Sequence, residues 1–141
     1  MRDGTIERLL RGELAALETY EQALQRSHDA SKMGRLTAIR NDHATIAQKL
    51  RQLLDADEDR DAPTGSGTWG AFAKAAEGVA TLIGDRAALR ALKAGEDHGL
   101  KLYEKALDAE ELDPDTKTLI REAILPKTRA HIQTLEELLE T

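Results

Sequence analysis

Residues 12–24 read GELAALETYEQAL and residues 95–107 read GEDHGLKLYEKAL, so one pattern occurs twice at an offset of 83 residues. The shared pattern is G-E-x-x-x-L-x-x-Y-E-x-A-L. Its Leu and Tyr positions recur at spacings of three and four, which predicts one apolar face of a helix. Each copy also places a glutamate, Glu13 or Glu96, on that face. This repeated helix is the basis for predicting both the fold and a candidate site.

The composition predicts an all-α protein with a single domain, residues 1–141. A chain of 141 residues is long enough to bury one sizeable core. Hydrophobic residues, mostly Ala and Leu, make up 40% of the chain, whereas aromatic residues make up 3%. Because Ala and Leu favour helices and strand-forming residues are scarce, we expect helices throughout.

Charge, hydropathy and motifs exclude several classes of function. The net charge is −6, and basic residues alternate with acidic ones, so we expect no nucleic-acid partner and no membrane partner. We find no apolar run near the ~20 residues of a membrane span and no signal peptide, and we expect a cytoplasmic protein. The absence of cysteine excludes disulfides and thiolate ligands. The sequence contains no phosphate-binding loop or nucleophile motif, so we lean against an enzyme.

Periodicity and turn signals predict two antiparallel helical hairpins. Hairpin 1 covers residues 3–55 and turns near residues 27–31, whereas hairpin 2 covers residues 85–139 and turns after a helix expected to end near residue 110. Pro126 falls inside the last helix and is expected to kink it. The repeat relates the two hairpins by a pseudo-twofold axis.

Residues 56–84 are expected to connect the hairpins. A charged, Gly/Pro-rich linker precedes a short helix at 68–83, in which Trp69 and Phe72 are expected to close the bundle end or contact a homo-oligomer partner. Two hairpins joined by one long crossover predict a ferritin-like four-helix bundle.

Each long helix carries one ionisable residue on its apolar face: Glu13, His43, Glu96 and His131. Glu13 and His43 are equidistant from the first predicted turn, and the other pair is equidistant from the second. Each hairpin therefore places a carboxylate beside an imidazole. Packing the hairpins at ~8–10 Å between helix axes brings all four groups towards one point.

Two interpretations of these four residues stay open. They could hold one divalent metal, since carboxylate and imidazole ligands suit Fe, Mn or Zn. Alternatively, each histidine is hydrogen-bonded to its glutamate in a metal-free cluster that fixes helix register. Two glutamates balance one divalent ion or two protonated histidines equally well. The first interpretation predicts a role in stability, metal buffering or stress protection, and the second predicts a structural or interaction module.

The paired GE…YE.AL helices, the segments SGTWGAF and GD, and the closing RAHIQTLEELL resemble an uncharacterised bacterial family of ferritin-like four-helix bundles. The resemblance extends over nearly the whole chain and implies a fold without an activity. Ferritin-like di-iron proteins have Glu on two helices and Glu-x-x-His on the other two. Arg40 and Thr128 stand where the second pair of glutamates would be. A di-iron centre and a ferritin-like oxidoreductase are therefore disfavoured, and one metal or none is expected.

Six further residues are assigned lesser roles: Tyr20, Tyr103, Glu21, Glu104, Asp42 and His98. The tyrosines are expected to be core residues with hydrogen-bonded hydroxyls. The three carboxylates are expected to lie on flanking or solvated faces. The histidine lies two residues from Glu96 and is expected to point away from it.

Overall fold

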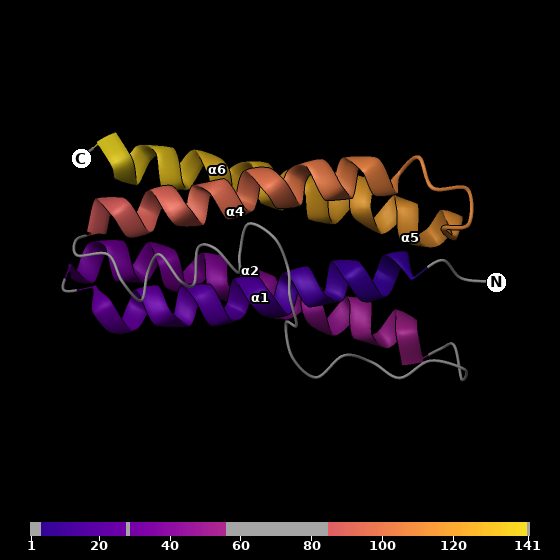
Figure 1. Ribbon diagram of the computed structural model, residues 1–141, viewed down its shortest axis with the longest axis horizontal. Helices are drawn as coiled ribbons and strands as arrows, with labels where there is room; N and C mark the ends of the chain where they lie inside the picture. The colour runs from indigo at the N-terminus through magenta and orange to yellow at the C-terminus, as the bar shows by residue number, and fades with distance from the viewer. Residues whose placement is uncertain (1–3, 28, 56–84, 141) are drawn as a thin grey trace.

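The structure is a computed structural model that describes residues 4–27, 29–55 and 85–140. All regular structure in these ranges is helical and no strand occurs, which confirms the all-α prediction (Figure 1). The elements are α1 (Thr5–Arg26), α2 (Ala30–Asp55), α4 (Asp85–Ala106), α5 (Pro114–Leu119), the π-helical segment η1 (Ile120–Ile124) and α6 (Leu125–Glu140). The predicted helix at 68–83, with Trp69 and Phe72, lies outside the described residues.

The four long helices pack side by side. α1 packs against α2 and α4, and α6 packs against α4 and α2. α1 and α6 run in one direction along the bundle, whereas α2 and α4 run in the other (Figure 1). Each helix is therefore antiparallel to both of its neighbours, and α2 ends at the opposite end of the bundle from the start of α4.

Local signals account for most helix boundaries. The Asp29 Oδ1 accepts hydrogen bonds from the backbone N–H groups of Ser31 (2.9 Å) and Lys32 (3.2 Å), so Asp29 caps α2. Pro114 occupies the first position of α5. α4, however, ends at Ala106, four residues before the expected end, and the following N–H groups of Asp108 and Ala109 bond three residues back. This tighter turn closes the helix where the sequence carries no stop signal.

The helix that was expected to kink at Pro126 contains a π-helical turn just before this proline. The N–H of Leu125 donates to the carbonyl of Ile120, five residues back. Pro126 then sits in the first turn of α6, where its missing N–H costs least. The last helix therefore consists of three consecutive segments, α5, η1 and α6. The π turn accommodates the missing N–H of Pro126.

The core is divided into two apolar clusters by a polar layer. One cluster gathers around Leu10, Leu50 and Ile120, and the other gathers around Ala16, Leu92 and Leu135. Along each helix, the ionisable residue of the apolar face lies between a residue of one cluster and a residue of the other. The repeat thus places polar groups at mid-bundle and apolar groups on both sides.

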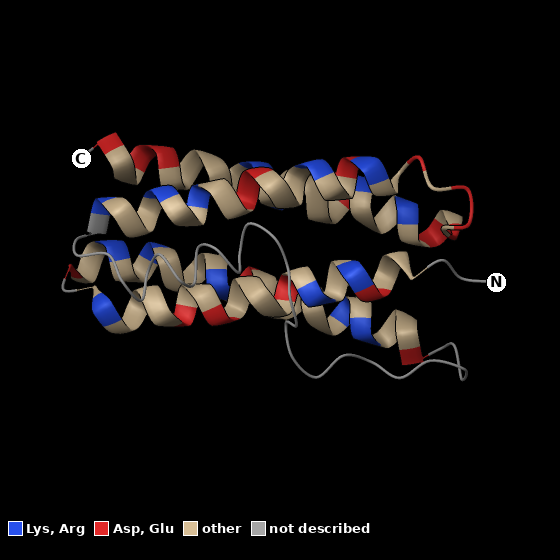
Figure 2. Cartoon of the chain, in the orientation of Figure 1, with Lys and Arg blue, Asp and Glu red and all other residues tan. Residues whose placement is uncertain are grey.

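The outer surface carries both signs of charge on every helix. Lys and Arg alternate with Asp and Glu along the bundle, and the connection between α4 and α5 is acidic (Figure 2). None of the helices in the described ranges combines the length and apolar character that a membrane crossing requires.

Candidate metal centre

The four residues predicted to share a site come together at mid-bundle, one from each of α1, α2, α4 and α6. All are buried, with relative exposures of 4% for Glu13, 3% for His43, 1% for Glu96 and 3% for His131. Buried ionisable groups persist only when they are paired or hydrogen-bonded. The contacts that pair them form what we call the mid-core network.

His43 bridges the two glutamates of the repeat. Its Nδ1 lies 2.7 Å from Oε1 of Glu13, and its Nε2 lies 2.7 Å from Oε2 of Glu96. The first contact lies within hairpin 1 and the second crosses to hairpin 2. One imidazole therefore ties the two halves of the protein together.

His131 contacts Glu96 and a carboxylate that was expected to be solvated. Its Nδ1 lies 3.3 Å from Oε1 of Glu96, and its Nε2 lies 2.8 Å from Oδ2 of Asp42. Asp42 lies beside the apolar face of α2 and is partly exposed, as expected, but its contact with the ring of His131 was not predicted. The contact forms because α2 and α6 are neighbours. The only indication of this contact in the sequence is that Asp42 directly precedes His43, a residue of the buried face.

The two tyrosines of the repeat also belong to the mid-core network. The hydroxyl of Tyr20 donates to Oε2 of Glu96 at 2.6 Å, and the hydroxyl of Tyr103 donates to Oε2 of Glu13 at 2.8 Å. The expectation of buried tyrosines with bonded hydroxyls is confirmed. Each tyrosine reaches the glutamate of the other repeat, because α1 and α4 pack antiparallel.

The electrostatics of the network follow from its contacts. Burial alone would lower the pKa of His43, but the adjacent carboxylates of Glu96 and Glu13 raise that pKa well above its ordinary value. Burial alone would raise the pKa of Glu96, but His43 and His131 hold that pKa far below its ordinary value. Asp42 behaves similarly, because burial opposes ionisation while His131 and Lys127 lower its pKa. Burial and the nearby glutamates raise the pKa of both tyrosines, so their hydroxyls stay protonated as donors.

Three members of the network could hold a metal ion. His43, Glu96 and His131 are buried, and each offers a ligand atom within 4.8 Å of the other two. Atoms bonded to one ion at roughly 2.0–2.2 Å lie about 3 Å apart. His43 Nε2 lies 2.7 Å from Oε2 of Glu96 and His131 Nδ1 lies 3.3 Å from Oε1, so each ring nitrogen is close to this distance from a different oxygen of the same carboxylate. Glu13 lies on the far nitrogen of His43, outside this group of three.

The positions expected to bear the bridging glutamates of a di-iron centre contribute no ligand. Arg40 donates to Glu21 at 2.8 Å on the partly exposed side of α2. The hydroxyl of buried Thr128 donates to the backbone carbonyl of Ile124 at 3.0 Å. Glu104 is exposed and lies 3.8 Å from Arg129. None of these side chains enters the mid-core network.

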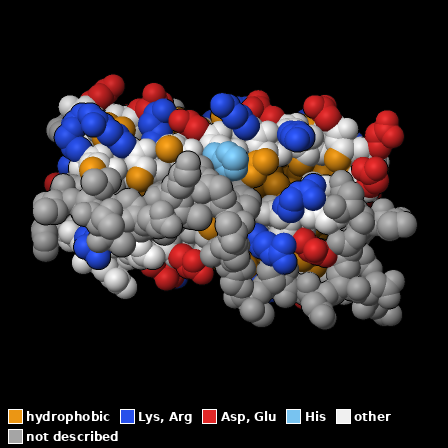
Figure 3. Space-filling view, in the orientation of Figure 1, with side chains coloured by type: hydrophobic (Ala, Val, Ile, Leu, Met, Phe, Trp, Pro, Cys, Tyr) orange, Lys and Arg blue, Asp and Glu red, His pale blue; other side chains and the backbone are white. Residues whose placement is uncertain are grey.

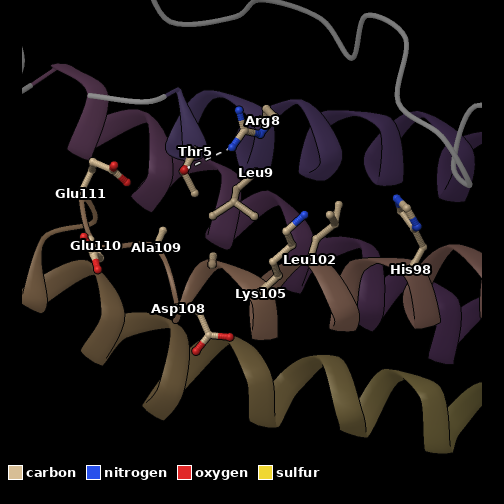
Figure 4. Close-up of a pocket in the computed structure, with 11 residues that line it drawn as sticks. Thr5, Arg8, Leu9, His98, Leu102, Lys105, Asp108, Ala109, Glu110 and Glu111 are labelled. Carbon is tan, nitrogen blue, oxygen red and sulfur yellow. Dashed lines mark hydrogen bonds between the residues drawn. The ribbon is translucent and has the colours of Figure 1, made fainter. Parts of the chain in front are cut away.

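A hollow separate from the mid-core network lies on the face formed by α1 and α4. It has a volume of about 710 Å³, and Leu9 and Leu102 line it between charged side chains (Figures 3 and 4). His98 stands at one end and the acidic pair Glu110 and Glu111 stands at the other (Figure 4). His98 therefore faces this hollow rather than the mid-core network, as its spacing from Glu96 suggested.

Comparison with known proteins returns no match, since no family model, no curated protein and no solved structure is similar to this chain.

Proposed function

We propose that this protein is a metal-binding helical bundle that holds one divalent transition metal at His43, Glu96 and His131. One nitrogen of each histidine contacts a carboxylate outside this group, Glu13 for His43 and Asp42 for His131. Such contacts fix the tautomer of metal-binding histidines and turn the other nitrogen towards the metal. The orientation of both rings by separate carboxylates is the observation that carries the proposal.

The donor set suits particular metals. Two imidazole nitrogens and one carboxylate match the preferences of Fe(II), Mn(II) and Zn(II), and the absence of cysteine removes thiolate ligands. A bound ion of this kind supplies a Lewis acid at a fixed position. Tyr20 would hold the Glu96 carboxylate in place through its hydroxyl, and Glu13 and Asp42 would hold the two rings.

The helix directions support a ferritin-like arrangement for this bundle. In that arrangement, two antiparallel hairpins are joined by one long crossover, and ligands project inward from facing helices. A two-metal oxidoreductase is not supported, because Arg40 and Thr128 supply no bridging carboxylate. Storage or buffering of a single metal, with a gain in stability on binding, fits this donor set best.

Cobalt titration tests this proposal. We expect one Co(II) per chain, a visible absorption spectrum typical of mixed nitrogen and oxygen ligands, and a melting temperature that rises on addition of metal and falls with chelator. Glu96→Gln should abolish binding while keeping the side-chain shape. His98→Gln is the matched control, since His98 lies outside the network. No metal uptake by the wild-type protein, and no thermal shift with Zn(II) or Co(II), would overturn the proposal.

A second candidate function is favoured by a different observation. All four ring nitrogens of His43 and His131 lie within hydrogen-bond distance of carboxylate oxygens. If both rings are protonated, the network closes without an ion and fixes the register of four helices. In the metal-free state, the carboxylates of Glu13, Glu96 and Asp42 balance the charges of two imidazolium rings and the Lys127 ammonium. In the metal-bound state, the same carboxylates balance the charges of one divalent ion and that ammonium. Chelator-insensitive stability would identify the metal-free structural module.

A further inference from the structure

Asp42 connects the buried network to solvent. Of the three carboxylates that contact the two histidines, Glu13 and Glu96 have side chains that are 6% and 1% exposed, whereas the side chain of Asp42 is 36% exposed. Oδ2 of Asp42 contacts the buried ring of His131 at 2.8 Å. Asp42 therefore has one oxygen in the network and lies at the edge of the bundle.

The other oxygen of Asp42 contacts a cation from the neighbouring helix. Nζ of Lys127 on α6 lies 3.4 Å from Oδ1 of Asp42, and 48% of the Lys127 side chain is exposed. An exposed ion pair of this kind contributes little to stability, so it opens readily at room temperature. A divalent cation that approaches this edge meets a carboxylate already occupied by a weaker, displaceable cation.

We propose that Asp42 is the solvent-side carboxylate of the metal centre, which receives the divalent metal in exchange for the Lys127 ammonium and passes it to His131 and Glu96. This inference rests on the proposed function for its metal. After transfer, Asp42 returns to the ring of His131 and positions it. No covalent or redox step is involved, since one cation replaces another at a carboxylate.

The association and dissociation rates of Co(II) test this assignment. Lys127→Gln removes the competing cation, and we expect both rate constants to rise by about tenfold while the equilibrium constant changes by less than about threefold. Asp42→Asn should slow association by about tenfold. The matched control is Arg35→Gln, because Arg35 and Glu137 form another exposed ion pair between α2 and α6 at 3.4 Å, away from the network. The control should keep wild-type rates.

A metal-free measurement separates failure of this inference from failure of the proposed function. Exchange of the imidazole N–H of His131 with water, followed by nitrogen-labelled histidine NMR, should be faster in Lys127→Gln and unchanged in Arg35→Gln. If no variant binds Co(II) but this exchange is faster, the metal function fails and Asp42 remains the route to solvent. Unchanged exchange in Lys127→Gln, or wild-type metal association in Asp42→Asn, overturns the inference.

Discussion

His43 and His131 occupy equivalent places in the two hairpins, yet their surroundings differ. Both ring nitrogens of His43 lie 2.7 Å from carboxylates of the repeat, so this histidine is enclosed by the two copies of the pattern. His131 shares Glu96 at 3.3 Å and turns its other nitrogen to Asp42, which is partly exposed. The position before His131 is Ala130, whereas the position before His43 is Asp42.

This difference shows how a duplicated pattern can produce an asymmetric site. The repeated glutamates and tyrosines form equivalent contacts across the two hairpins. The single unmatched carboxylate, Asp42, contacts the ring of His131 at 2.8 Å, whereas the carboxylates at 2.7 Å from His43 both belong to the repeat. His43 therefore lies between two buried carboxylates, whereas His131 lies between one buried carboxylate and one that is partly exposed.

The largest effect should come from the glutamates, because Glu96 contacts His43, His131 and Tyr20, whereas Glu13 contacts His43 and Tyr103. Glu96→Gln should lower the free energy of unfolding of the metal-free protein by about 3–5 kcal/mol, since it strands buried donors. Glu13→Gln should cost less. Urea denaturation measures both variants, and equal losses would show that the two copies are energetically equivalent.

The change in the free energy of unfolding at alkaline pH should depend on His43. Its pKa is raised in the folded protein, so the stability it contributes is complete below the unfolded pKa of about 6.5 and is lost as pH rises through the folded pKa. We expect the free energy of unfolding without metal to fall at alkaline pH in the wild type. His43→Gln should remove this decline. Unfolding curves across the pH range check the effect, and an unchanged decline in the variant would assign it to another group.

Replacing either tyrosine should lower the free energy of unfolding by less than Glu96→Gln does. Tyr103→Phe removes the donor to Oε2 of Glu13, whereas Tyr20→Phe leaves Oε2 of Glu96 with His43. We expect losses of about 1–3 kcal/mol, with Tyr103→Phe the more costly, because a charged acceptor is left less satisfied. Thermal and urea unfolding of the two variants compare them. The reverse order would mean that the shorter 2.6 Å bond of Tyr20 dominates.

The smallest changes in stability should come from Asp42, the carboxylate without a counterpart in hairpin 2, and from Ala130 at the corresponding position. Asp42→Asn should cost about 0.5–1 kcal/mol near neutral pH, since its contacts lie at a partly exposed site. Because its folded pKa is lowered, the contribution of Asp42 is present above the unfolded pKa and is lost on acidification. Ala130→Asp, which copies hairpin 1 into hairpin 2, should change stability by less than about 0.5 kcal/mol. If Ala130→Asp shifted the NMR signals of His43, the new carboxylate would contact His43 in the way that Asp42 contacts His131.

Local pattern was sufficient to predict most of the described fold. The apolar stripes of α1 and α4 depend on residues close in the chain, so they could be predicted directly from the sequence. Equal distances from the two turns also brought the four predicted residues to one depth. The end of α4 and the π turn could not be predicted, because each reflects a choice between competing backbone hydrogen bonds.

The sequence by itself determined that this chain forms helices with a buried carboxylate or imidazole on each long one, because helical periodicity is local and the repeat enforces it twice. Tertiary packing alone decided which oxygen meets which ring nitrogen. The contacts of Asp42 with His131 and of Tyr20 with Glu96 join residues on different helices, 89 and 76 positions apart. They depend on the rotation and axial offset of packed helices, which no local pattern encodes.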